Sequence, residues 1–293
     1  MLWILLTLAA APLQVARNAA QRGLVGDAGP WGATLVRFLF GLPFSILIFV
    51  VVAALTPDAA PHASLLFWVG AVVGAISQVA GTGFLLMAMH RAGFAVATVL
   101  QQSSLPLAAV MGWLVLGDRL SSQSWIGIGV ATASLAILSW PRRDEARNGL
   151  TGGMLGLAAG AAFAVAFNGY RQAGLALDPG HPIYSATAAL VIAQLMQSLA
   201  LGALLAVTRP QAIGAVLRSW RHSMGAGFFG SAASACWFGA LALAPAGPVR
   251  AVALIETPIA AAVGRRLFRE RLGLRQLAGG VLATFGVALT ALG

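Results

Sequence analysis

The most constraining feature of this sequence is an internal repeat that relates its two halves. Pro106 recurs 152 positions later as Pro258, and Asp118 corresponds to Glu270 at the same offset. A chain with such a repeat is expected to fold as two equivalent units, here residues 1–146 and 147–293. The identical positions are Ala92, Pro106, Ala108, Ala109, Gly112, Arg119, Leu120, Gly127, Ala131, Thr132 and Ala136, with copies at Ala244, Pro258, Ala260, Ala261, Gly264, Arg271, Leu272, Gly279, Ala283, Thr284 and Ala288.

The composition places most of the chain in lipid. It is 59% hydrophobic and only 9% charged, whereas a soluble domain carries about a quarter charged residues. Apolar runs of about 20 residues can cross a bilayer as helices, and backbone groups in lipid must be hydrogen-bonded within their own segment. We therefore predict an all-α integral membrane fold of ten transmembrane helices, five in each half. The apolar runs cover 2–20, 31–54, 65–88, 93–116, 122–140, 150–172, 182–207, 221–244, 248–268 and 273–292.

The placement of arginine predicts the topology. All 18 basic residues are arginine, and most lie in the connections that follow odd-numbered runs. These connections are expected to be cytoplasmic, with both termini periplasmic and the chain in the inner membrane. Five spans per half is an odd number, so the halves should insert in opposite orientations. Inverted repeats of this kind commonly support alternating access. The dispersed arginines also argue against a partner nucleic acid, which would need them gathered on one face.

The repeated motif resembles the ten-span EamA-type permeases of the drug/metabolite transporter superfamily. The match runs from Leu105-Pro106-Leu107 to Gly117-Asp118-Arg119-Leu120, and again from Thr257-Pro258-Ile259 to Arg269-Glu270-Arg271-Leu272. The resemblance implies a central cavity formed mainly by spans one, three, four, six, eight and nine. It also implies transport of small metabolites, and bacterial members of this kind are often exporters of aromatic and neutral amino acids.

Charged residues inside the apolar runs are the first candidates for function. Glu256 is the only carboxylate well inside a run, and an ionisable group at this depth usually faces a cavity or a partner. It could bind a substrate amine or carry a coupling proton, or it could form a structural pair with an arginine. Arg17 ends the first run; its fixed guanidinium would suit a carboxylate, but the favoured interpretation is a marker of the membrane interface. Arg37 is interpreted as a brace between helices.

Neutral polar side chains at membrane depth are the second group of candidates. They can hydrogen-bond a neutral or zwitterionic solute without burying a charge, although such groups also join transmembrane helices. The candidates for substrate binding are Gln78, Gln101, Gln102, Ser103 and Asn168.

Three further residues complete the predicted site. Trp237 lies deep in the eighth run and could form an apolar wall against a substrate. Pro106 and Pro258 each remove a backbone donor from a helix, so both are expected to interrupt their helices and free backbone carbonyls for substrate.

Catalysis is not expected. There is no His-Glu-x-x-His run for a metal and no Walker motif for ATP, and the four histidines lie near the ends of runs, far apart in the sequence. The sequence therefore predicts no cofactor, no metal and no enzyme.

The sequence thus predicts a secondary transporter that exports small metabolites, with neutral or aromatic amino acids as the leading substrates. The alternative is a sugar, nucleotide-sugar or drug permease of the same fold. Phosphorylated substrates would favour several deep cations, for which only Arg17, Arg37 and Arg250 are candidates, so substrates of this kind are ranked lower. The expected partners are a small-molecule substrate and the lipid bilayer, with coupling to protons possible.

Overall fold

The computed structural model describes residues 1–139, 148–268, 282, 285–286 and 288–290. Helices dominate this part of the chain, and seven segments of it are long and apolar enough to cross a membrane. The predicted all-α membrane fold is confirmed. The count of ten spans stays a prediction, because most of the last run, 273–292, and most of the connection between the halves lie outside the described residues. The helices are α1 (Leu2–Leu39), α2 (Leu42–Leu55), α3 (Leu65–Ala92), α4 (Phe94–Gln101), α5 (Ser104–Leu116), α6 (Ser122–Ser139), α7 (Asn148–Leu177), α8 (Pro182–Thr208), α9 (Pro210–Arg218), α10 (Trp220–Leu243), α11 (Ala246–Val252), the 3-10 turn η1 (Ala253–Ile255) and α12 (Glu256–Phe268).

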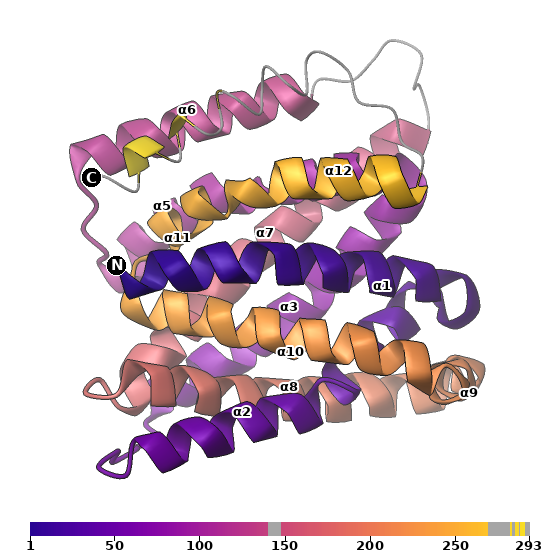
Figure 1. The fold of residues 1–293 in the computed structure, drawn as a ribbon, viewed down its shortest axis with the longest axis horizontal. Coiled ribbons are helices and arrows are strands. Elements are labelled where there is room, and N and C mark those ends of the chain that lie inside the picture. The colour runs from indigo at the N-terminus through magenta and orange to yellow at the C-terminus, as the bar shows by residue number, and fades with distance from the viewer. Residues whose placement is uncertain (140–147, 269–281, 283–284, 287, 291–293) are drawn as a thin grey trace.

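The first helix is longer than the sequence predicted. Helical structure continues past residue 20 to Gly29, where the backbone turns with φ 69° and ψ 171° before Pro30. A glycine adopts this conformation readily because it has no Cβ. The chain then returns along the bundle (Figure 1). As a result Arg17, expected at the end of a span, lies near the middle of the first segment.

The fourth spans of the two repeats are both interrupted, and at equivalent positions. The first divides into α4 and α5 around Gln102 and Ser103, and the second divides into α11 and α12 around η1. α11 packs against α5, while α12 packs against α4, so the two interrupted helices run antiparallel. This is the arrangement expected when repeats insert in opposite orientations.

Among the described residues, the most extensive contact between two helices joins α3 to α7 and depends on glycine. Gly70 and Gly74 of α3 face Gly169 and Tyr170 of α7, close enough that backbone touches backbone. Small residues allow this approach, which gives transmembrane helices their van der Waals contact. The other extensive pair is α1 with α10. The α3–α7 pair and the α1–α10 pair are equivalent under the repeat. α3 and α10 are the third spans of the two halves, and α7 corresponds to the first segment of α1.

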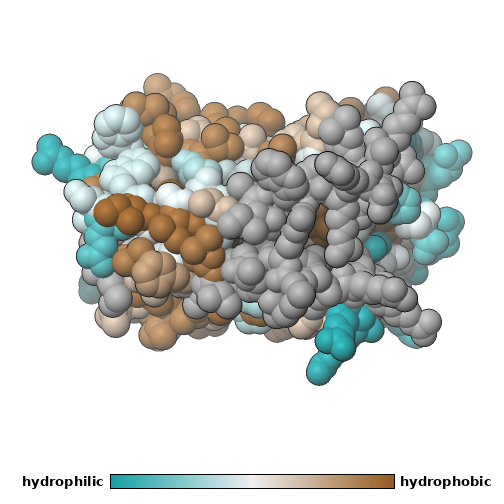
Figure 2. Space-filling model, turned by 90° about the horizontal axis from the view of Figure 1, so that it is seen from above, coloured by the Kyte–Doolittle hydropathy of each residue, from teal (hydrophilic) through white to brown (hydrophobic). Residues whose placement is uncertain are grey.

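The outer surface suits a bilayer. On the face seen in Figure 2, apolar side chains lie along the flanks, and hydrophilic ones gather toward the two ends of the long axis. Large apolar residues such as Leu47 and Val50 of α2 and Leu65 and Ile76 of α3 are more than half exposed. These helices are therefore expected to present them to lipid.

Asp178 ties together two loops at one end of the bundle. Its carboxylate accepts hydrogen bonds from the backbone N–H of Ala60 (2.9 Å) and of Gly180 (3.0 Å). His181 Nδ1 lies 3.0 Å from the same carboxylate. Burial acts to raise the pKa of Asp178, but these hydrogen bonds and His181 outweigh it and lower the pKa below its ordinary value.

We expect Asp178→Asn to lower the midpoint of thermal unfolding at neutral pH. A carboxyl whose pKa is depressed by folding stabilises the protein above its unfolded pKa of about 3.9 and loses that contribution as pH falls through the folded value. The difference between wild type and variant should therefore shrink in acid. Asp58→Asn, which changes an exposed acid in the neighbouring loop, is the control. Equal midpoints for Asp178→Asn and wild type at pH 7 would contradict the prediction.

Candidate substrate-binding site

One face of the first helical segment is polar throughout its middle. Gln14, Arg17, Asn18 and Gln21 are spaced by three and four residues, so they lie on the same side of the helix. All four are at most 5% exposed, on a helix that packs against α10 and α12. Gln14, Asn18 and Gln21 are not among the site residues predicted from the sequence. Their helical spacing within an otherwise apolar run was the signal that could have found them.

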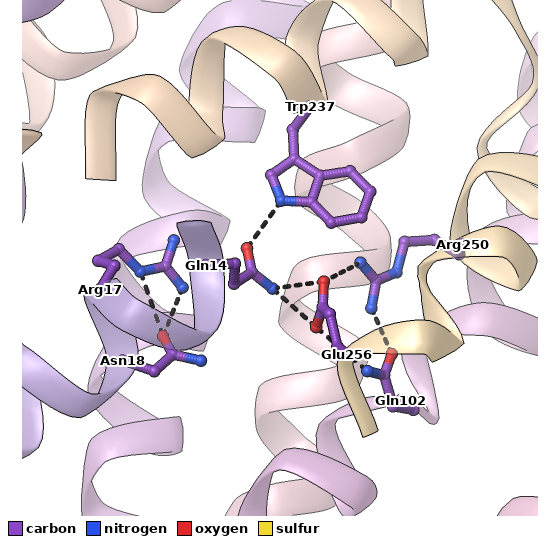
Figure 3. A network of polar contacts seen from close by, with 7 residues as sticks. All are labelled: Gln14, Arg17, Asn18, Gln102, Trp237, Arg250 and Glu256. Atoms are coloured by element: carbon purple, nitrogen blue, oxygen red, sulfur yellow. Dashed lines mark hydrogen bonds and ion pairs between the residues drawn. The ribbon is translucent and has the colours of Figure 1, made fainter. Parts of the chain in front are cut away.

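Glu256 is the centre of a buried network formed by both repeats (Figure 3). Both of its carboxylate oxygens accept from Gln14 Nε2 at 3.0 Å, and Oε2 also accepts from Gln102 Nε2 at 3.2 Å. Trp237 Nε1 donates to Gln14 Oε1 at 2.8 Å. Glu256 is completely buried. Its carboxylate accepts hydrogen bonds from α1 and from the interrupted span α4–α5, both of the first repeat.

Arg250 supplies the opposite charge. Its Nη1 lies 3.6 Å from Glu256 Oε1, and its Nη2 donates to Gln102 Oε1. The guanidinium group lies 4.8 Å from the ring centres of both Phe167 and Trp237. The faces of aromatic rings attract a cation, so the arginine is held between an ion pair and two rings. The structural pairing that the sequence left open for Glu256 is therefore present, with Arg250 as the partner.

The repeat places different residues at these two positions in the first half. Thr98 stands where the second half has Arg250, and Ser104 stands where it has Glu256. Thr98 Oγ1 donates to the Phe94 carbonyl of its own helix, at 2.8 Å. The two interrupted spans are thus alike in backbone but not in charge.

The interruption of the first of these spans leaves several polar groups without a protein partner. Both amide atoms of Gln101 and the hydroxyls of Ser103 and Ser104 are buried and lack a hydrogen bond among the described residues. In the second span the same holds for the Thr257 hydroxyl. Buried polar groups usually find a partner, so these atoms offer hydrogen bonds to a small polar molecule.

The remaining predicted residues lie in other contacts. Gln78 accepts from Tyr170 Oη at 2.8 Å and from Gln197 Nε2 at 2.8 Å, which joins α3, α7 and α8. Asn168 donates to the carbonyls of Ala108 (3.1 Å) and Ala164 (3.0 Å). Neither forms a hydrogen bond with the Glu256 network among the residues that the structure describes.

The interpretation of Arg17 as an interfacial marker is wrong. The residue is 1% exposed and lies near the middle of its helix, because that helix extends beyond the predicted end of the span. Arg37 is 2% exposed and donates to Thr82 Oγ1 of α3 (3.0 Å) and Ser234 Oγ of α10 (3.1 Å). These contacts join helices, as the sequence analysis expected of Arg37.

A groove of about 590 Å³ also lies between α3 and α8, but its chemistry differs. Val72, Ile76 and Val79 line it from α3, and Met196 and Leu199 line it from α8. An apolar groove among lipid-facing helices suits an acyl chain better than a polar solute. The polar network around Glu256 is therefore the stronger candidate for the site.

We expect Trp237→Leu to lower the midpoint of thermal unfolding more than Trp237→Phe does. Phenylalanine keeps a ring beside Arg250 but loses the N–H bond to Gln14, a loss of about 1 kcal/mol. Leucine also loses the cation–ring attraction, which is worth about 2 kcal/mol when desolvated. Thermal unfolding of the two purified variants beside wild type measures the difference. Two equal midpoints would show that the ring does not hold Arg250.

Comparison with known proteins agrees with this architecture. The model of the EamA-like transporter family matches residues 1–140 and again residues 150–292. Twenty-two chains of solved structures also match this chain. One crystal structure aligns with a TM-score of 0.65 at 15% identity and covers 99% of this chain and 96% of its own, a similarity that concerns the fold alone. No curated protein matches the sequence. Two family matches that together cover nearly the whole chain show that it belongs to the EamA-like transporter family, whose members are membrane transporters and not enzymes.

Proposed function

We propose that this transporter is a secondary carrier that moves small metabolites across the inner membrane by alternating access, with both termini periplasmic. The observation that carries the proposal is the buried network of Gln14, Gln102, Arg250 and Glu256. It joins the first helix of one repeat to the interrupted spans of both. Antiparallel interrupted helices that meet at polar groups are the usual site of substrate in carriers with inverted repeats.

The proposed binding residues fall into two sets. Gln102, Trp237 and Glu256 belong to the network itself, while Gln101 and Ser103 line the adjoining interruption before Pro106. Pro258 follows η1 at the equivalent place in the second repeat. Gln78 and Asn168 stay proposals of a second rank, because they form hydrogen bonds with other helices.

Amino acids, neutral or aromatic, are the leading proposed substrates, and export is the proposed direction. Amide and carboxylate groups can bind an ammonium group, and Phe163, Phe167 and Trp237 form a row of rings that could contact an apolar side chain. Glu256 would carry the proton if transport is coupled to a proton gradient. The alternative remains a sugar, nucleotide-sugar or drug permease of the same fold.

The test is uptake of labelled solutes into proteoliposomes that contain the purified chain, with and without a proton gradient. The panel comprises aromatic, small neutral and acidic amino acids, a sugar, a nucleotide sugar and a cationic dye. Saturable uptake of amino acids, competed by related amino acids, is the expected result. Uptake of the sugar or the dye without uptake of amino acids would replace amino acids as the proposed substrate class. Faster uptake with the proton gradient would establish coupling to protons.

A further inference from the structure

Two buried arginines lie side by side in the interior of the bundle. Arg17 and Arg37 belong to the two segments of α1, on either side of the turn at Gly29. Both pack on Gly230 of α10: a Cβ there would lie 3.1 Å from Arg37 Cγ and 3.4 Å from Arg17 Cδ. The glycine thus leaves the room that the two side chains share.

Among the residues that the structure describes, the hydrogen-bond partners of this pair are neutral. Arg17 donates through Nε (3.2 Å) and Nη2 (2.6 Å) to the side-chain oxygen of Asn18. Arg37 donates to the hydroxyls of Thr82 and Ser234. Within the described part of the chain neither guanidinium pairs with a carboxylate. Arg17 Nη1 and Arg37 Nε are buried and have no partner there.

Arg250, in contrast, is a buried arginine whose positive charge is balanced by a carboxylate. Its charge is offset by Glu256, the only carboxylate well inside an apolar run. Arg17 and Arg37 therefore leave an excess of two positive charges in the described interior. Arginine cannot discard its proton, an unpaired ion buried in protein is costly, and adjacent like charges repel.

An anion placed between the two groups would reduce this imbalance. A guanidinium presents a planar fork of donors that fits a carboxylate or a phosphate, and each arginine has an N–H free to donate. Asn18 Nδ2, also buried and without a hydrogen-bond partner in the described ranges, adds a third donor. A neutral or zwitterionic solute would leave the net charge of the occupied site unchanged.

We propose that Arg17 and Arg37 bind the anionic group of the transported solute, so that the preferred substrate is a small organic anion with a carboxylate or phosphate group. This inference rests on the proposed carrier function and narrows it. It shifts the preference from neutral amino acids toward acidic ones, and it restores phosphorylated metabolites as substrates.

The experiment compares solutes that differ mainly in charge. Labelled glutamate and glutamine form one pair, and glycerol 3-phosphate and glycerol form the other, each tested for saturable uptake into proteoliposomes of the full chain. We expect the anion of at least one pair to be favoured by about tenfold or more over its neutral twin. Preference for glutamate would identify a carboxylate as the ligand, and preference for glycerol 3-phosphate would identify a phosphate.

Variants then connect the preference to the two arginines. Arg17→Gln is expected to lower the apparent affinity for the anion about tenfold or more without a comparable effect on the neutral twin. Arg119→Gln, which removes an exposed arginine, should leave both unchanged. If Arg17→Gln does not fold, Arg17→Lys keeps the charge but loses the fork and should weaken anion uptake to a smaller extent.

The outcomes separate this inference from the carrier function on which it rests. Saturable uptake of neutral solutes with no preference for either anion would overturn the inference and leave the carrier intact. Anion preference that persists in a folded Arg17→Gln/Arg37→Gln protein would also overturn it. Absence of saturable uptake for every solute of the two pairs and of the wider panel would contradict both proposals.

Discussion

Replacement of Glu256 by glutamine is expected to abolish transport and to destabilise the protein by about 3 kcal/mol or more. The substitution keeps the shape of the side chain but leaves the charge of Arg250 buried without its partner. Removal of one member of a buried ion pair costs about 3–5 kcal/mol for this reason. The glutamine would also present an amide N–H₂ to Gln14 and Gln102, whose own N–H₂ groups now donate to the carboxylate.

The double variant Arg250→Met/Glu256→Gln distinguishes lost charge balance from lost shape. With both charges gone no buried ion remains at this place, so thermal stability should recover most of the difference, while transport should stay absent. The coupling between the two sites follows from the double-mutant cycle. Unfolding midpoints for Glu256→Gln and the double variant that both equal wild type would show that the ion pair does not stabilise the fold.

The second large effect is expected from Gly70→Ala at the crossing of α3 and α7. A Cβ at this position would lie 2.5 Å from the carbonyl oxygen of Gly169 and 2.9 Å from the backbone nitrogen of Ala173. Both atoms belong to a helix backbone, so the clash can be relieved only if the helices separate. Overpacking in a well-packed interior costs about 1–3 kcal/mol and occasionally more, and a clash with backbone should lie at the upper end.

The matched control is Gly225→Ala in α10, where a Cβ would meet nothing within 4 Å. Alanine is favoured over glycine in a helix, so this variant should be as stable as wild type or slightly more stable. Size-exclusion profiles and unfolding midpoints of the two variants measure the contrast. If Gly70→Ala matched Gly225→Ala in stability, the close approach of α3 and α7 would not be needed for the fold.

The general form of this fold could be predicted from the sequence because it depends on patterns that persist over long stretches. Apolar runs define the helices, and the repeated Pro106 and Pro258 gave the expectation that both fourth spans are interrupted. The length of the first helix was misjudged because residues 20–28 are less apolar than the preceding run and resemble a connection. That error assigned Arg17 to the interface.

The ion pair between Arg250 and Glu256 could not be deduced from spacing. Residues six apart on a continuous α-helix point about 120° away from each other. The 3-10 turn Ala253–Ile255 winds more tightly, with about 120° per residue instead of 100°, which reduces the separation to about 60°. A local change in helix winding therefore brings the two charges to the same side, and no pattern of apolar residues predicts that change.

The unequal charges of the two interrupted spans have a consequence for energetics. Under alternating access, the inward-open and outward-open forms exchange the roles of the two repeats. If Thr98 and Ser104 were an arginine and a glutamate, as Arg250 and Glu256 are, the exchange would carry the interrupted spans into an equivalent arrangement of charge. They are not, so in a carrier that works by alternating access the two empty forms would differ in free energy. The unloaded protein would then rest with one side open more often than the other, and a solute would meet a higher apparent affinity on that side, without any gradient across the membrane.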